Sequence, residues 1–207
     1  MRKSANNLKQ NNTILAAILV GALAMLLPAI AQAHPGHGAH EAGFVAGLLH
    51  PLTGLDHLLA LLGVGLWSQQ QQGAARVWMP LSFAAAILGG AGLAGMGVAL
   101  PGMELGIAAS VLILGLLVAS ARALPLGWAV LLGAFFALFH GYAHVAELPA
   151  TSVLPGYMLG FMMMSLLAIT GGAGLARLFE RASSRAYFAR ATGLGMALAG
   201  AIFALSA

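Results

Sequence analysis

Long apolar runs, separated by short segments that contain glycine, proline or charged residues, make up most of this chain. A helix that crosses a membrane needs about 20 consecutive apolar residues. Six runs beyond residue 42 reach or approach that length, and they cover residues 43–67, 77–100, 105–121, 124–146, 154–175 and 188–207. The pattern therefore predicts an all-α fold, a polytopic membrane helix bundle with about six transmembrane helices.

The composition favours the same fold class. Of the 207 residues, 60% are hydrophobic and only 7% are charged. A soluble domain with this composition would have a largely apolar surface, so we expect the chain to lie in a lipid bilayer. The chain has no cysteine. This excludes disulfides and thiolate ligands, and it leaves imidazole and carboxylate for any metal site.

The first 33 residues resemble a signal peptide. Basic residues at positions 2, 3 and 9 precede an apolar stretch over 14–31, and Ala31-Gln32-Ala33 fits a small-residue cleavage site. The alternative is an uncleaved first membrane helix. The predicted organisation is a signal peptide over 1–33, a His-rich periplasmic N-terminal tail over 34–42 and a six-helix transmembrane domain over 43–207.

The arginines predict the orientation of the bundle, because short cytoplasmic loops of membrane proteins collect Lys and Arg. With an external mature N-terminus, all arginines beyond the signal peptide fall on the inner side: Arg76, Arg122, Arg177, Arg181, Arg185 and Arg190. The outer segments instead contain Glu41, Glu104 and Glu147, which would attract cations. We expect a multi-pass protein of a bacterial inner membrane, with both mature termini in the periplasm and no nucleic-acid partner.

Strongly polar residues gather in two of the apolar runs, where they are most costly. The run over 43–67 contains HPLTGLDH at residues 50–57, and the run over 124–146 ends in FHGYAHVAE, which extends to residue 147. Ionisable groups inside a bilayer indicate an ion or proton pathway. Histidines with carboxylates from two helices are a typical ligand set of a divalent transition-metal ion. The candidate metal ligands are His50, Asp56, His57, His140, His144 and Glu147.

In a regular helix, with about 100° per residue, His50 and His57 lie on one face and so do His140 and His144. Small residues share each of these two faces, which we call stripes. The two stripes consist of Gly43, Gly47, His50, Gly54 and His57, and of Gly133, Ala137, His140, His144 and Glu147. Small residues let membrane helices approach closely. We expect the two stripes to pack together and to place imidazoles from both helices in one dry cavity.

Asp56 lies off its stripe in a regular helix. Pro51 and Gly54 could interrupt the helix and swing Asp56 toward the cavity as a ligand. Otherwise Asp56 would accept a hydrogen bond that fixes an imidazole tautomer. The sequence leaves both roles open.

The rise of about 1.5 Å per residue in a regular helix spreads these polar groups in depth. One ion would not reach all of them at once. This geometry predicts a ladder, with Glu147 and His144 at the outer mouth, His50 and His140 next, and Asp56 and His57 near the midplane.

Three further histidines lie in the glycine-containing tail, namely His34, His37 and His40. They could capture metal outside the membrane. Alternatively, the segment is an ordinary solvated tail, and the sequence does not separate these interpretations.

The two polar motifs resemble those of the HupE/UreJ family, membrane proteins associated with hydrogenase and urease maturation. Family members have a signal peptide, about six helices, an HPxxGxDH motif in the first mature helix and an FHGxAHxxE motif in the fourth. This chain matches both motifs without departure, and the resemblance covers the whole mature chain. It implies uptake of nickel, or in some members cobalt, for cytoplasmic metalloenzymes, with the six candidate ligands as the functional positions.

The sequence therefore predicts a nickel or cobalt permease and not an enzyme. Ni²⁺ or Co²⁺ would be the transported ion, no prosthetic group is expected, and the oligomeric state is open. The main alternative is an intramembrane hydrolase, in which zinc bound by His50, His140 and His144 activates water and Asp56 or Glu147 acts as base. Imidazole and carboxylate also suit zinc and copper, so the choice of metal comes from the resemblance.

Overall fold

The computed structural model describes residues 43–148, 154–180 and 185–207. The predicted signal peptide over 1–33, the tail histidines His34, His37 and His40, and the charged residues Glu41 and Arg181 lie outside the described residues.

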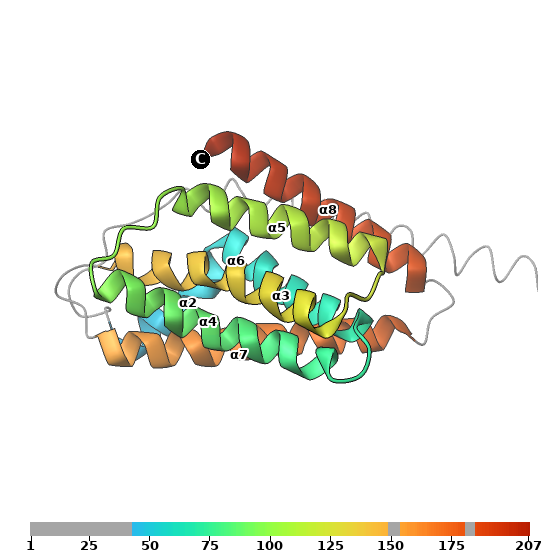
Figure 1. Cartoon of the computed structure of the whole chain (residues 1–207), viewed down its shortest axis with the longest axis horizontal. Coiled ribbons are helices and arrows are strands. Elements are labelled where there is room, and N and C mark those ends of the chain that lie inside the picture. The colour runs from blue at the N-terminus through green and yellow to red at the C-terminus, as the bar shows by residue number, and fades with distance from the viewer. Residues whose placement is uncertain (1–42, 149–153, 181–184) are drawn as a thin grey trace, which may run out of the picture.

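Seven helices joined by short connections make up the described residues, and no strand occurs among them. They are α2 (Phe44–Thr53), α3 (Leu55–Gln70), α4 (Ala75–Gly95), α5 (Met103–Ser120), α6 (Leu126–Ala146), α7 (Leu154–Glu180) and α8 (Arg185–Ser206) (Figure 1). The helices α4 to α8 are long and apolar enough to cross a membrane, and α2 with α3 is a sixth candidate span, broken between the two helices. The predicted all-α membrane bundle is confirmed, although α4 ends before the predicted position 100 and α7 continues to Glu180.

The first span is broken at Gly54, where α2 and α3 meet at an angle of 83°. Pro51 lies near the end of α2 and has no backbone N–H to donate, and Gly54 contributes little helix stability. Gly54 takes an extended conformation with φ −88° and ψ 104°. A Cβ there would lie 3.2 Å from Asp56 Oδ1 and 3.3 Å from His57 Nδ1, so glycine leaves room for both side chains.

Close helix pairs build the rest of the bundle. Helix α4 packs on α6, α5 packs on α8, and both halves of the broken span pack along α7 (Figure 1). Glycines lie at these contacts, because a Cβ on Gly141 would overlap the Ile87 carbonyl and one on Gly193 would overlap the backbone of Ala119. Small residues therefore bring the helix backbones together, as is common in membrane proteins.

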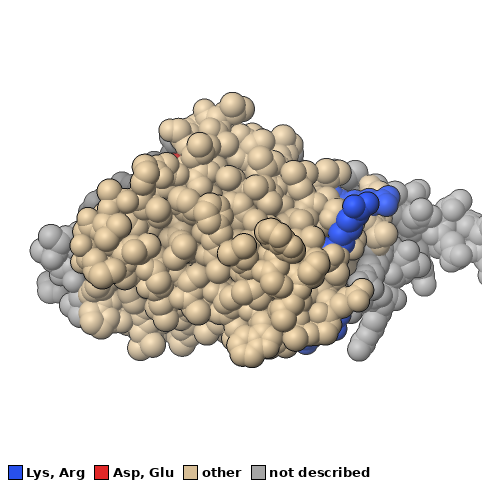
Figure 2. Space-filling view, viewed as in Figure 1, with Lys and Arg blue, Asp and Glu red and all other residues tan. Residues whose placement is uncertain are grey.

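Apart from Asp56, the charged residues named here lie at the two ends of the bundle. Arg76 donates a hydrogen bond of 3.1 Å to the backbone carbonyl of Gln69, and Arg177 donates one of 3.1 Å to the side-chain oxygen of the same residue. Glu104 lies in the first turn of α5 and Glu147 follows the last turn of α6, at the opposite end. Figure 2 shows Lys and Arg gathered at one end of the visible face, and the remainder of that face carries almost no charge.

Substitution of a glycine at a helix contact tests whether the two helix backbones lie as close together as the structure shows. Gly193→Ala should lower the thermal stability of the purified protein in detergent, because its Cβ would overlap α5, and overpacking costs about 1–3 kcal/mol. Gly195 lies on the same helix with nothing within 4 Å of an added Cβ. Gly195→Ala is the matched control and should be neutral or stabilising, since Ala favours a helix over Gly by about 1 kcal/mol. Equal melting temperatures for the two variants would contradict the α5–α8 contact.

Candidate metal site

Four histidine rings meet inside the bundle. His50 comes from α2 and His57 from the first turn of α3, while His140 and His144 come from α6. The ring centre of His57 lies 4.7 Å from that of His140 and 4.4 Å from that of His144. His50 lies 4.6 Å from His144 and 6.0 Å from His57. We call these four rings the imidazole cluster.

The spacing of the ring centres suits a shared ion, but the side chains are not arranged to hold one. Two imidazoles that bind one ion through nitrogens about 2.0–2.1 Å away have ring centres roughly 4.5–5 Å apart. The four close pairs are edge-on, with interplanar angles of 62° to 90°. Within the described residues, no three His, Asp or Glu side chains are placed to hold an ion as they stand. Side chains of the cluster would therefore have to move before three of them could bind one ion.

Burial leaves several nitrogens of the cluster without a partner. His57, His140 and His144 are 6%, 2% and 1% exposed. Among the described residues, neither nitrogen of His144 nor Nε2 of His57 has a hydrogen-bond partner. An unpaired buried polar atom costs about 1–3 kcal/mol. Three such atoms on two rings whose centres lie 4.4 Å apart point to a polar ligand, such as a cation or water, as the partner of these rings.

Asp56 contacts the cluster through His57. It is the second residue of α3, where the helix dipole favours a carboxylate. Its Oδ1 accepts a hydrogen bond from the His57 backbone N–H at 2.7 Å and lies 2.8 Å from His57 Nδ1. A carboxylate only accepts, so Nδ1 carries the proton and Nε2 of neutral His57 carries the lone pair. Of the two roles considered for Asp56, this geometry matches the one that fixes a tautomer.

The surroundings of the cluster include residues that the sequence did not single out. The ring of Phe161 lies 3.7 Å from that of His144, and Tyr157 lies 5.9 Å from His50. The hydroxyl of Ser110, on α5, lies 2.7 Å from His140 Nε2. A lone serine or an aromatic residue in an apolar span is ordinary, so no signal in the sequence connects these residues to the histidines.

The predicted ladder is wrong. The break at Gly54 places the first turn of α3 beside His50, so His57 does not lie a further step deeper. The ring centre of His144, expected near the mouth, lies 4.4 Å from that of His57, expected near the midplane. Glu147 does lie at the end of α6 and is exposed.

The two small-residue stripes do not pack against each other, contrary to expectation. Gly47 faces the backbone of Tyr157 on α7, and Gly133 faces Met79 on α4. The backbone of α6 packs mainly on α4, and the broken span packs mainly on α7. The histidine side chains reach across the space between α6 and the broken span, which confirms that the cluster draws on two separate segments.

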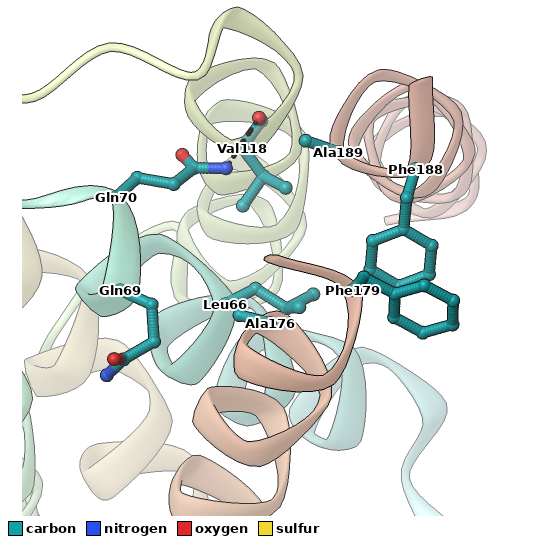
Figure 3. A pocket seen from close by; sticks show the side chains of 8 residues that line it. All are labelled: Leu66, Gln69, Gln70, Val118, Ala176, Phe179, Phe188 and Ala189. Atoms are coloured by element: carbon teal, nitrogen blue, oxygen red, sulfur yellow. Dashed lines mark hydrogen bonds between the residues drawn. The ribbon is translucent and has the colours of Figure 1, made fainter. Parts of the chain in front are cut away.

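A small cavity of about 30 Å³ lies at the arginine-containing end, between α3, α5, α7 and α8 (Figure 3). Its lining is apolar apart from Gln69 and Gln70, and Gln70 Nε2 donates to the Val118 carbonyl at 3.0 Å. No histidine or carboxylate is among its lining residues. This cavity therefore offers no metal ligands of the predicted kind.

Comparison with known proteins shows the same family that the two polar motifs resemble. The family model described as HupE / UreJ protein matches residues 22–203. The chain belongs to the HupE/UreJ family. A HupE/UreJ relative, Protein HupE of Rhizobium leguminosarum bv. viciae, is 43% identical over 180 residues, which cover 86% of this chain and 92% of the relative. No solved structure matches the chain. This HupE/UreJ protein is thus a multi-pass membrane protein of a family linked to hydrogenase and urease accessory roles.

Proposed function

We propose that this protein is a permease for Ni²⁺, or Co²⁺, and that the imidazole cluster binds the ion during passage. The observation that supports this most is the contact of four histidine rings inside a membrane bundle. Imidazole nitrogen binds divalent first-row transition metals. Ionisable groups inside a membrane bundle are typical of ion pathways. The family's link to hydrogenase and urease accessory roles favours nickel among the ions that imidazole binds.

Passage of an ion suits the cluster better than hydrolysis does. A catalytic zinc needs three protein ligands, an open position for water and a base beside that position. Asp56, one of the two carboxylates considered as base, is already engaged by the backbone and ring of His57. Side chains that must move to bind an ion also suit an ion that is held and then released. We therefore assign the metal as cargo, with no prosthetic group and no enzyme activity.

We also propose that the arginine-containing end faces the cytoplasm of a bacterial inner membrane. Both the start of α2 and the end of α8 would then face the periplasm. Glu104 and Glu147 would lie on the side from which cations arrive. Residues 1–33 would be removed as a signal peptide, and His34, His37 and His40 would capture metal when it is scarce.

Transport is tested most simply with purified protein in liposomes and external Ni²⁺, Co²⁺, Zn²⁺ or Cu²⁺. We expect initial flux of Ni²⁺ or Co²⁺ with the wild type. His144→Phe should reduce flux to near the protein-free level, because it keeps an aromatic ring beside Phe161 but removes both nitrogens. Ser165→Ala is the control, since Ser165 is buried and its hydroxyl donates to the Phe161 carbonyl of its own helix, with no bond to another helix among the described residues. Full flux with His144→Phe, or no flux of Ni²⁺ or Co²⁺ with the wild type, whether or not Zn²⁺ or Cu²⁺ passes, would refute the proposal.

Orientation and burial can be measured together by cysteine labelling, since the chain has no native cysteine. A membrane-impermeant maleimide applied to intact spheroplasts should label Glu147→Cys, because this position is exposed and periplasmic in the proposed orientation. Arg122→Cys is also exposed and should react only after the membrane is permeabilised. His144→Cys should stay unlabelled in both conditions, because it is buried. Labelling of Arg122→Cys but not of Glu147→Cys in intact spheroplasts would reverse the orientation.

A further inference from the structure

Ser110 is a buried polar residue that the function proposed above does not yet use. It lies in the middle of α5 and is fully buried. Its Oγ is 2.6 Å from the Ile107 carbonyl oxygen, one turn earlier in α5, and 2.7 Å from His140 Nε2 on α6. Ser110 therefore connects α5, which supplies no candidate ligand to the cluster, with a histidine of the imidazole cluster.

The direction of these two hydrogen bonds follows from a count of protons. A serine hydroxyl has one proton to donate and can also accept. Serines in helices commonly donate to the carbonyl three or four residues earlier, and Ser110 does so to Ile107. If Ser110 instead donated to His140, its oxygen and the Ile107 carbonyl oxygen would face each other at 2.6 Å with no proton between them. His140 Nε2 must therefore be the donor to Ser110.

We propose that Ser110 is a positioning residue that holds neutral His140 with its proton on Nε2, and that Nδ1 is consequently the nitrogen that His140 offers to a divalent transition-metal cation. The second half of this statement rests on the proposed transport function. The assignment of the proton does not, because it follows from the two contacts of Ser110 alone.

His57 shows the opposite arrangement. Asp56 accepts from Nδ1 of His57 and so leaves the lone pair on Nε2, which has no partner among the described residues. The rings of His57 and His140 lie 4.7 Å apart at an interplanar angle of 90°. Two acceptors on different helices, a carboxylate and a hydroxyl, thus set two neighbouring imidazoles in different tautomers. An arriving cation would meet lone pairs at fixed atoms and would not have to wait for a proton to move from one ring nitrogen to the other.

The tautomer can be measured without any metal. In metal-free protein with ¹⁵N-labelled histidine, solid-state NMR distinguishes a protonated from an unprotonated ring nitrogen, and the His140 signals are those missing from His140→Gln. We expect a protonated Nε2 and an unprotonated Nδ1 for His140 in the wild type and in Ser165→Ala. Ser110→Ala should produce a His140 population with Nδ1 protonated, whereas Ser110→Thr should restore the wild-type pattern because it keeps the hydroxyl. A protonated Nδ1 in the wild type, or a pattern unchanged in Ser110→Ala, would overturn the assignment.

A nickel titration of the same proteins tests the consequence for the ion. Loss of a group that orients a ligand typically weakens metal binding about 10- to 100-fold, and we expect a change in this range for Ser110→Ala, with wild-type affinity for Ser165→Ala. If Ser110→Ala bound nickel as tightly as the wild type, the hydrogen bond from His140 to Ser110 would not determine how His140 binds the cation. If the wild type bound neither Ni²⁺ nor Co²⁺ while the NMR pattern held, the transport proposal and the role of Nδ1 would fail and the tautomer assignment would stand.

Discussion

The break at Gly54 is the constraint on which the candidate site depends. In a continuous helix His50 and His57 would be separated by about 10 Å along the axis, at about 1.5 Å per residue. The 83° bend brings their ring centres to 6.0 Å and creates a helix N-terminus beside them. That N-terminus places Asp56 where its carboxylate can accept from both the backbone and the ring of His57. One irregular residue therefore positions three of the candidate polar groups.

The positions of the protons on the buried rings then determine which nitrogens the cluster can offer to a cation. An imidazole buried in an apolar bundle needs a partner for each of its two nitrogens. Asp56 is the partner of one nitrogen of His57, and Ser110 is the partner of one nitrogen of His140. In each ring the other nitrogen is left as an acceptor. His144 has no partner for either nitrogen among the described residues. A divalent cation bound by these lone pairs would replace the missing partners. The aromatic ring of Phe161 against His144 keeps this environment apolar.

The sequence predicted the elements of this site better than their arrangement. Apolar runs were long enough to define the spans, and two dense polar motifs marked the histidines, because both signals are local. Pro51 and Gly54 indicated an interruption, but the direction of the bend depends on how both halves pack along α7, which is a long-range contact. The ladder failed for this reason. The contact of Ser110 with His140, 30 positions away, likewise requires α5 to be placed against α6. Metal binding by the six candidate residues stays a prediction.

The central claim is that histidines of the broken span and of α6 bind one transition-metal ion together. X-ray absorption at the nickel edge of purified, nickel-loaded protein measures this directly, because imidazole ligands give a characteristic multiple-scattering pattern. The account predicts more than one imidazole on the ion, with fewer in both His57→Ala and His140→Ala. A spectrum with oxygen ligands only, or one unchanged by either substitution, would contradict it.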